Sequence, residues 1–299
     1  MSAADVSVLQ RPHDRLRRRR AVNRGMEALA WLAAALAVLT LGIVVWSVAS
    51  RGASALSFDF LTKPMAPIGF VSPHQGLVNA FIGTFILVGL ATLMALPFGI
   101  LIAIYVNEYA SKSIRNAVTL TLDVLAGVPA IVIGFFVYGL IVVAHGQSAY
   151  AGAFALAVLM LPLVGRSTME VLALVPDSLR EAALGVGAPR WRTTLGVVLP
   201  QTIGGVLTGA VLAVARVAGE TAPLLFTCSL VGIGTTWDPS KPVMSVPLAI
   251  YELTDSPEPA DHARAWAAAL VLLIFILVVS LTARWLATRS RRKIAQATR

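Results

Sequence analysis

Residues 181–200 read EAALGVGAPRWRTTLGVVLP; they follow one long uncharged stretch, residues 148–165, and run into a second, residues 193–215. The preceding residues Pro176, Asp177 and Ser178 are typical of a helix start. The sequence from there to Arg190 consists largely of good helix formers. The pattern therefore predicts a helix that connects two apolar stretches without being one itself.

The apolar stretches are long enough to cross a membrane. The 299 residues are 57% hydrophobic and 13% charged, against roughly 25% charged in soluble domains. Between Glu27 and Arg51 lie 23 uncharged residues, and between Arg264 and Arg284 lie 19, each close to the ~20 that span a hydrocarbon core. Similar stretches cover residues 77–106, 117–144, 148–165 and 193–215. We therefore expect an all-α integral membrane protein with six transmembrane helices.

Lys and Arg residues gather on one side of these predicted spans. With the N-terminus in the cytoplasm, the inner segments hold 18 of them and the outer segments hold 4. Cytoplasmic loops carry this excess in membrane proteins, so both termini are predicted to be cytoplasmic. The formal net charge of +9 belongs to these flanking segments and gives no reason to expect nucleic acid as a partner.

The chain is predicted to form a single membrane domain, residues 27–289. It lies between a basic N-terminal tail, residues 1–26, and a basic C-terminal tail, residues 290–299. The N-terminal tail is expected to lie near anionic lipid head groups. The outer loops, residues 51–76 and 237–261, are rich in proline, and turns rather than folded domains are expected there.

The sequence lacks the usual signs of an enzyme. It contains no G-x-x-x-x-G-K-[ST] phosphate-binding loop and no H-E-x-x-H motif. The single cysteine, Cys228, has no second cysteine with which to bind a metal, and the histidines are scattered without ligand spacing: His13, His74, His145 and His262. We therefore expect no ATPase site, no metal site and no cofactor in this chain.

Two charged residues, Arg216 and Glu220, stand out because the segment around them, residues 193–237, is otherwise uncharged. Insertion of each at a helix centre costs ~2.5 to 3.5 kcal/mol. At ~100° per residue, both lie within about 60° of Gly205 and Gly209 on a helical wheel. This face should look into the helix bundle or at a partner subunit.

Two interpretations of Arg216 and Glu220 remain open. The residues could neutralise each other and close a helix contact. Alternatively, Arg216 could attract an anion while Glu220 weakens the attraction enough for release, or the pair could act as a gate. Gly219 and Pro223 predict a bent or broken helix here, which in a membrane is tolerated where the backbone is buried in protein or lines a cavity.

Three further charged residues are predicted to be structural. Arg166 and Glu170, four residues apart near the inner end of the fourth span, are expected to form an anchoring salt bridge. Asp123 is expected at the start of the third span, where a carboxylate favours a helix N-terminus.

The stretch quoted first resembles the EAA loop of ATP-binding-cassette (ABC) importer permeases: E-A-A, three residues, G, nine residues, I-x-L-P. This sequence departs from the pattern only at Val197, which replaces Ile. The resemblance implies the type I (MetI-like) permease fold and a coupling segment at residues 176–200. In that family the helix docks into an ATPase subunit. The matching residues here are Glu181, Ala182, Ala183, Gly187, Leu199 and Pro200.

A second resemblance concerns the transported substrate. Residues 216–224, RVAGETAPL, are similar to the fifth-span signature of phosphate importer permeases. Residues 104–109, IYVNEY, and 125–134, LAGVPAIVIG, resemble the PstA-type subunit, although Ala130 stands where Ser is expected. The resemblance implies a substrate path formed by Arg216, Gly219, Glu220 and Thr221.

This resemblance also implies partners: a PstC-like sister permease, two cytoplasmic ATPase subunits that bind ATP and Mg, and an extracytoplasmic phosphate-binding protein. The complex would lie in the plasma membrane of a prokaryote. The alternatives are an importer of another oxyanion, such as sulfate, molybdate or a phosphonate, and an ATPase-independent secondary transporter or channel. A membrane enzyme is less favoured because the sequence offers no candidate nucleophile and base.

Overall fold

The computed structural model describes residues 13–66, 75–228 and 234–297. Within these ranges, every regular element is helical. The chain divides into two compact units at Ser50 and Arg51. Helix α1 runs from His13 to Gly52. Its described residues up to Ser50 belong to the first unit, and its last two residues, Arg51 and Gly52, belong to the second unit.

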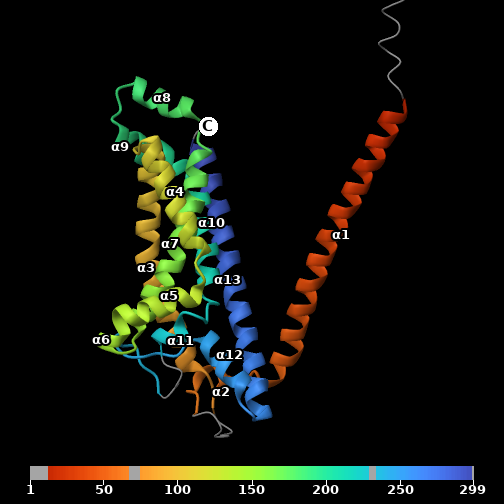
Figure 1. Ribbon diagram of the computed structural model, residues 1–299, viewed down its shortest axis with the longest axis vertical. Coiled ribbons are helices and arrows are strands. Elements are labelled where there is room, and N and C mark those ends of the chain that lie inside the picture. Colours follow the sequence, from red (N-terminus) through yellow and green to blue (C-terminus); the bar gives the residue numbers. More distant parts are fainter. Residues whose placement is uncertain (1–12, 67–74, 229–233, 298–299) are drawn as a thin grey trace, which may run out of the picture. The chain divides into compact units, whose positions relative to one another are not determined.

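The second unit is a bundle of long helices with short helices at both ends (Figure 1). Its helices are α2 (Phe58–Thr62), α3 (Val78–Glu108), α4 (Lys112–Gly127), α5 (Ala130–Val137), α6 (Val143–His145), α7 (Ala149–Ala173), α8 (Asp177–Gly185), α9 (Arg190–Thr193), α10 (Leu199–Val217), α11 (Leu224–Thr227), α12 (Val246–Asp255) and α13 (Pro259–Ala297). π-Helical turns join α5 to α6 at Tyr138–Val142 and α9 to α10 at Thr194–Val198.

Five helical stretches are long and apolar enough to cross a membrane: residues 18–55, 78–108, 149–173, 190–217 and 259–282. A sixth span is formed if α4 and α5–α6 are counted together, but these two segments are bent by 95°. The six predicted spans are therefore present if this bent pair, which covers the predicted third span, is counted as one. The reason for the bend is Pro129, which lacks an N–H group and holds the preceding Val128 in an extended conformation.

Small residues bring α3 and α7 together in the most extensive helix contact of the bundle. A Cβ atom added at Gly99 of α3 would lie 2.8 Å from Cγ1 of Val164 on α7. The buried face of α7 is rich in Ala and Gly, including Ala151 and Gly152. Helix association in lipid depends on such close packing, because the surrounding lipid chains are as apolar as the side chains.

Helix α10 packs on α7 and α13. The glycines on the face of α10 that was predicted to look into the bundle or at a partner subunit do look into the bundle: Gly205 approaches Val171 and Gly209 approaches Ser167, with no room for a Cβ atom at either glycine. The two glycines therefore fix how α10 lies against α7.

The outer loops contain more helix than their prolines indicated. Helix α12 lies within residues 237–261, where turns were expected. The hydroxyl of Ser245 accepts the Leu248 N–H at 3.3 Å and caps this helix. Pro247 occupies its first turn, where a missing N–H costs nothing. In the other loop, α2 precedes residues 67–74, which lie outside the described residues.

Both predicted tails continue neighbouring helices. Residues 13–26 belong to α1, while residues 1–12 lie outside the described residues. Helix α13 runs through the predicted C-terminal tail to Ala297. Figure 1 shows the C-terminal part of α13 at the same end of the bundle as α8, which is the arrangement that a shared cytoplasmic side requires.

Candidate functional site

Helix α8 is the helix predicted between the fourth and fifth spans. It lies at one end of the bundle (Figure 1), and none of its residues is buried. Glu181 and Ala182 are exposed, and Ala183 is half-buried. Large apolar side chains in and beside α8 are exposed as well: Leu174, Leu179, Leu184, Val186 and Trp191. The helix therefore presents an uncovered surface of small, apolar and acidic residues.

Gly187 ends α8 in a left-handed conformation, with φ +83°. Its N–H donates to the Leu184 carbonyl at 2.9 Å, and the Ala188 N–H donates to the Ala183 carbonyl at 3.1 Å. This is a Schellman motif, which favours glycine at that position. A Cβ atom at Gly187 would meet nothing within 4 Å. Within this chain, the backbone conformation at residue 187 therefore favours glycine.

Leu199 and Pro200 lie in the first turn of α10, where the end of the predicted coupling segment, residues 176–200, overlaps the apolar stretch 193–215. The membrane-crossing helical stretch already begins at Arg190. Pro200 cannot donate a backbone hydrogen bond, and the wider π-helical turn Thr194–Val198 comes directly before it. The EAA pattern thus begins on exposed α8 and ends inside a spanning helix.

Arg180 was not singled out from the sequence, yet it joins α8 to two spans. Its Nη2 atom lies 3.0 Å from Oε1 of Glu108 at the end of α3. Nη1 donates to the Val175 carbonyl at 2.6 Å, and Nη2 donates to the Leu172 carbonyl at 3.0 Å. The hydrogen bond with Glu108 raises the pKa of Arg180 above its ordinary value despite partial burial. Arg180 and Glu108 are 72 positions apart, so no local sequence motif indicates that they form a pair.

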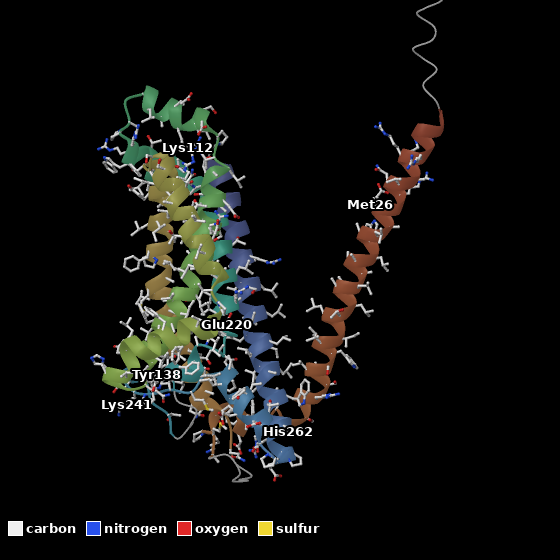
Figure 2. All side chains as sticks on the ribbon, viewed as in Figure 1. Met26, Lys112, Tyr138, Glu220, Lys241 and His262 are labelled. Carbon is white, nitrogen blue, oxygen red and sulfur yellow. The ribbon has the colours of Figure 1, made fainter. Side chains whose placement is uncertain are left out.

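Arg216 and Glu220 are near each other, with Nε and Oε1 4.0 Å apart. Helix α10 ends at Val217, so Glu220 lies in the following turn, and the helical wheel used for the sequence does not extend to it. The Arg216 side chain is 67% exposed in the single chain, and that of Glu220 is 25% exposed. Figure 2 shows Glu220 away from both ends of the bundle, at a depth where charges are expensive.

The break after α10, predicted from Gly219 and Pro223, is confirmed. Gly219 is exposed and Thr221 is half-buried in this turn. The turn touches α5 closely, because a Cβ atom added at Gly134 would lie 2.5 Å from Cα of Pro223. The two broken spans therefore meet at Gly134 and Pro223, where irregular backbone is buried in protein.

Arg166 pairs with Asp123 instead of Glu170, with Nε and Oδ1 3.1 Å apart. Asp123 lies near the end of α4, so its expected role at a helix start is wrong. The break at Pro129 explains the difference, because it makes α4 a separate helix that begins at Lys112.

Among the described residues, no group of three His, Cys, Asp or Glu side chains could hold a metal ion. Cys228 is fully buried. His145 and His262 both approach backbone carbonyls, those of Ile141 and Ser256.

Comparison with solved structures shows the fold. A chain of a bacterial ABC transporter involved in the import of the acidic polysaccharide alginate matches with a TM-score of 0.61 and 17% identity, covering 91% of this chain and 99% of that one. The MetNI methionine ABC transporter, in an inward-facing conformation, matches with a TM-score of 0.56 and 17% identity, covering 71% and 93%. The bundle therefore has the MetI-like permease fold.

Sequence comparison shows the family. Residues 95–292 match the model of the binding-protein-dependent transport system inner membrane component. Phosphate transport system permease protein PstA of Pasteurella multocida is 39% identical, covering 89% of this chain and 94% of that protein. PstA 1 of Mycobacterium tuberculosis is 38% identical, covering 92% and 91%. The chain therefore belongs to the family of binding-protein-dependent transport system inner membrane components, among the permeases of the PstA type.

Proposed function

We propose that this chain forms part of the membrane path of an ABC importer for inorganic phosphate. The observation that carries the proposal is the 37 to 39% identity, over about nine-tenths of the chain, to permeases named for phosphate transport. The arginine exposed at membrane depth agrees with an anionic substrate, because a guanidinium offers a fork of donors to an oxyanion.

In this proposal Arg216, Gly219, Glu220 and Thr221 line the substrate path. Arg216 attracts the anion, and Glu220, close by and less exposed, limits the depth of the attraction. Conduction requires binding strong enough for entry and weak enough for release. The exposed Arg216 side chain would be covered by the sister permease or by water in the path, since contact with lipid chains is costly.

Coupling to ATP is assigned to α8. Glu181, Ala182, Ala183 and Gly187 would dock into a cytoplasmic ATPase subunit, where Glu181 meets a cation and the small side chains permit a close fit. Leu199 and Pro200 would carry the movement into α10, in whose first turn they lie. ATP and Mg would be bound by the ATPase subunits, with no cofactor in this chain.

The complete importer would contain a PstC-like sister permease, two ATPase subunits and an extracytoplasmic phosphate-binding protein. It would lie in the plasma membrane of a prokaryote, with both termini and α8 in the cytoplasm and with anionic lipid beside the basic termini. The excess of Lys and Arg in the predicted inner segments supports this orientation.

Uptake of radiolabelled phosphate by a host without its own permeases tests this function. Expression of the chain with all its partners should restore phosphate uptake, and unlabelled sulfate, molybdate or phosphonate in excess should not compete. Uptake of labelled sulfate, molybdate or phosphonate, without uptake of phosphate, would support an importer of that anion. Uptake that persists without the ATPase subunits would support a secondary transporter or channel.

A further inference from the structure

The side chain of Arg180 reaches from α8 to the ends of two membrane-spanning helices. Its guanidinium contacts the Glu108 carboxylate through both Nε and Nη2, at 3.3 and 3.0 Å. The same group donates to the carbonyls of Leu172 and Val175, at 3.0 and 2.6 Å. Asp177 of α8 accepts a further hydrogen bond at 3.0 Å and holds the guanidinium from its own helix.

These acceptors gather where α3 and α7 end. Glu108 is the last residue of α3, and the two carbonyls lie in the last turn of α7 and just after it. Helix ends leave such carbonyls without partners inside the helix, and they favour a cation. The Glu108 and Arg180 side chains are only 8% and 18% exposed, so one cation ties α8 to the most extensively packed helix pair of the bundle.

Other attachments of α8 are few. The helix buries no residue, so an apolar core does not hold it in place. Among its described side chains, only that of Arg180 forms hydrogen bonds or ion pairs with α3 or with the end of α7. The chain connects α8 to α7 through residues 174–176, and to α10 through α9 and the π-helical turn.

We propose that Arg180 and Glu108 form a clamp that makes α3 and α7 move with α8. The inference rests on the proposed function, in which an ATPase subunit moves α8. Through the chain alone, that movement reaches α7, by residues 174–176, and α10, by α9 and the π-helical turn. The clamp carries it to α3 as well and adds a side-chain link to the end of α7, so that α3, α7 and α10 move together. Arg180 is thus a positioning residue that does not touch the substrate.

The test uses the complete importer in proteoliposomes, with phosphate uptake and ATP hydrolysis measured together. Arg180→Lys keeps the positive charge but loses the planar guanidinium that donates to several acceptors at once. The complex should still assemble and hydrolyse ATP, but the amount of phosphate moved per ATP should fall by about tenfold. Glu108→Gln should lower the ratio in the same direction. Arg115→Ala is the matched control: Arg115 donates to the Val106 and Asn107 carbonyls at the end of α3 without touching α8.

An unchanged ratio in assembled Arg180→Lys and Glu108→Gln complexes would overturn the clamp, as would an equal loss in Arg115→Ala. If Arg180→Ala fails to assemble while Arg180→Lys remains fully coupled, the residue serves stability alone and the clamp is again overturned. Failure of the proposed function gives a different result, because the unaltered complex would then hydrolyse ATP without moving phosphate.

Discussion

The Nε atom of Arg216 lies 4.0 Å from Oε1 of Glu220, beyond the reach of a good hydrogen bond. The Arg216 side chain is also largely exposed. A pair that only closed a helix contact would be expected to be shorter and buried. The open arrangement therefore favours the other interpretation, in which the guanidinium keeps donors available for an anion.

Replacement of Arg216 by Ala should reduce phosphate uptake at least about tenfold, because each lost hydrogen bond to a charged group is worth ~1.5 to 3 kcal/mol. Assembly should be unaffected, since the side chain packs on little within this chain. Leu212→Ala is the control, one turn earlier on α10 and 69% exposed. Wild-type uptake by an assembled Arg216→Ala complex would remove Arg216 from the path.

Replacement of Glu181 by Ala should weaken attachment of the ATPase subunit and lower transport. Glu181 is exposed on α8 and has no described salt bridge within the chain, so its expected partner is a cation on another subunit. Co-purification of the ATPase subunit and phosphate moved per ATP measure the effect. Ser178→Ala, another exposed change on α8, should have none. A normal coupling ratio in Glu181→Ala would show that α8 transmits movement without this carboxylate.

Replacement of Gly187 by Ala should fray the end of α8 at a cost of ~1 to 2 kcal/mol, because φ +83° is unfavourable for a residue with a Cβ atom. The expected result is weaker binding of the ATPase subunit. Gly185→Ala is a matched control, since Gly185 is helical and a Cβ atom there meets nothing within 4 Å. It should be neutral or slightly stabilising. Equal binding by both variants would exclude the importance of the Schellman motif.

The predicted orientation can be tested with single cysteines, because the native Cys228 is fully buried. Ser178→Cys on α8 and Gln147→Cys between α6 and α7 both place a thiol at an exposed position. A membrane-impermeant maleimide added to spheroplasts should label Gln147→Cys and should label Ser178→Cys only after permeabilisation. The reverse pattern would place α8 outside the cell and exclude its contact with a cytoplasmic ATPase.

Local signals in the sequence predicted the elements that depend on nearby residues. The helix start before α8 and the break at Pro223 follow from the backbone preferences of a few neighbouring side chains. Turns were predicted for the proline-rich segment 237–261, but the segment contains helix α12. Pro247 lies in the first turn of that helix, where proline is compatible with a helix. Composition alone does not distinguish this position from a turn.

Features that depend on distant contacts could not be predicted. Pro129 favours a break in the helix, but the 95° angle between the two segments depends on how α4 and α5 pack on the rest of the bundle. The partner of Arg166 changed from Glu170 to Asp123 for the same reason. Arg180 binds two backbone carbonyls and the carboxylate of Glu108, which is 72 positions earlier in the sequence. Every residue has a backbone carbonyl, so the sequence does not show which carbonyls a side chain binds.

The most direct test of ATP-driven phosphate import is a reconstitution. The chain, its sister permease and the ATPase subunits are placed in proteoliposomes, and the binding protein and labelled phosphate are added on the side opposite α8. We predict phosphate accumulation that requires both the binding protein and ATP on the α8 side. Absence of accumulation with every partner present, or accumulation without ATP, would contradict this account.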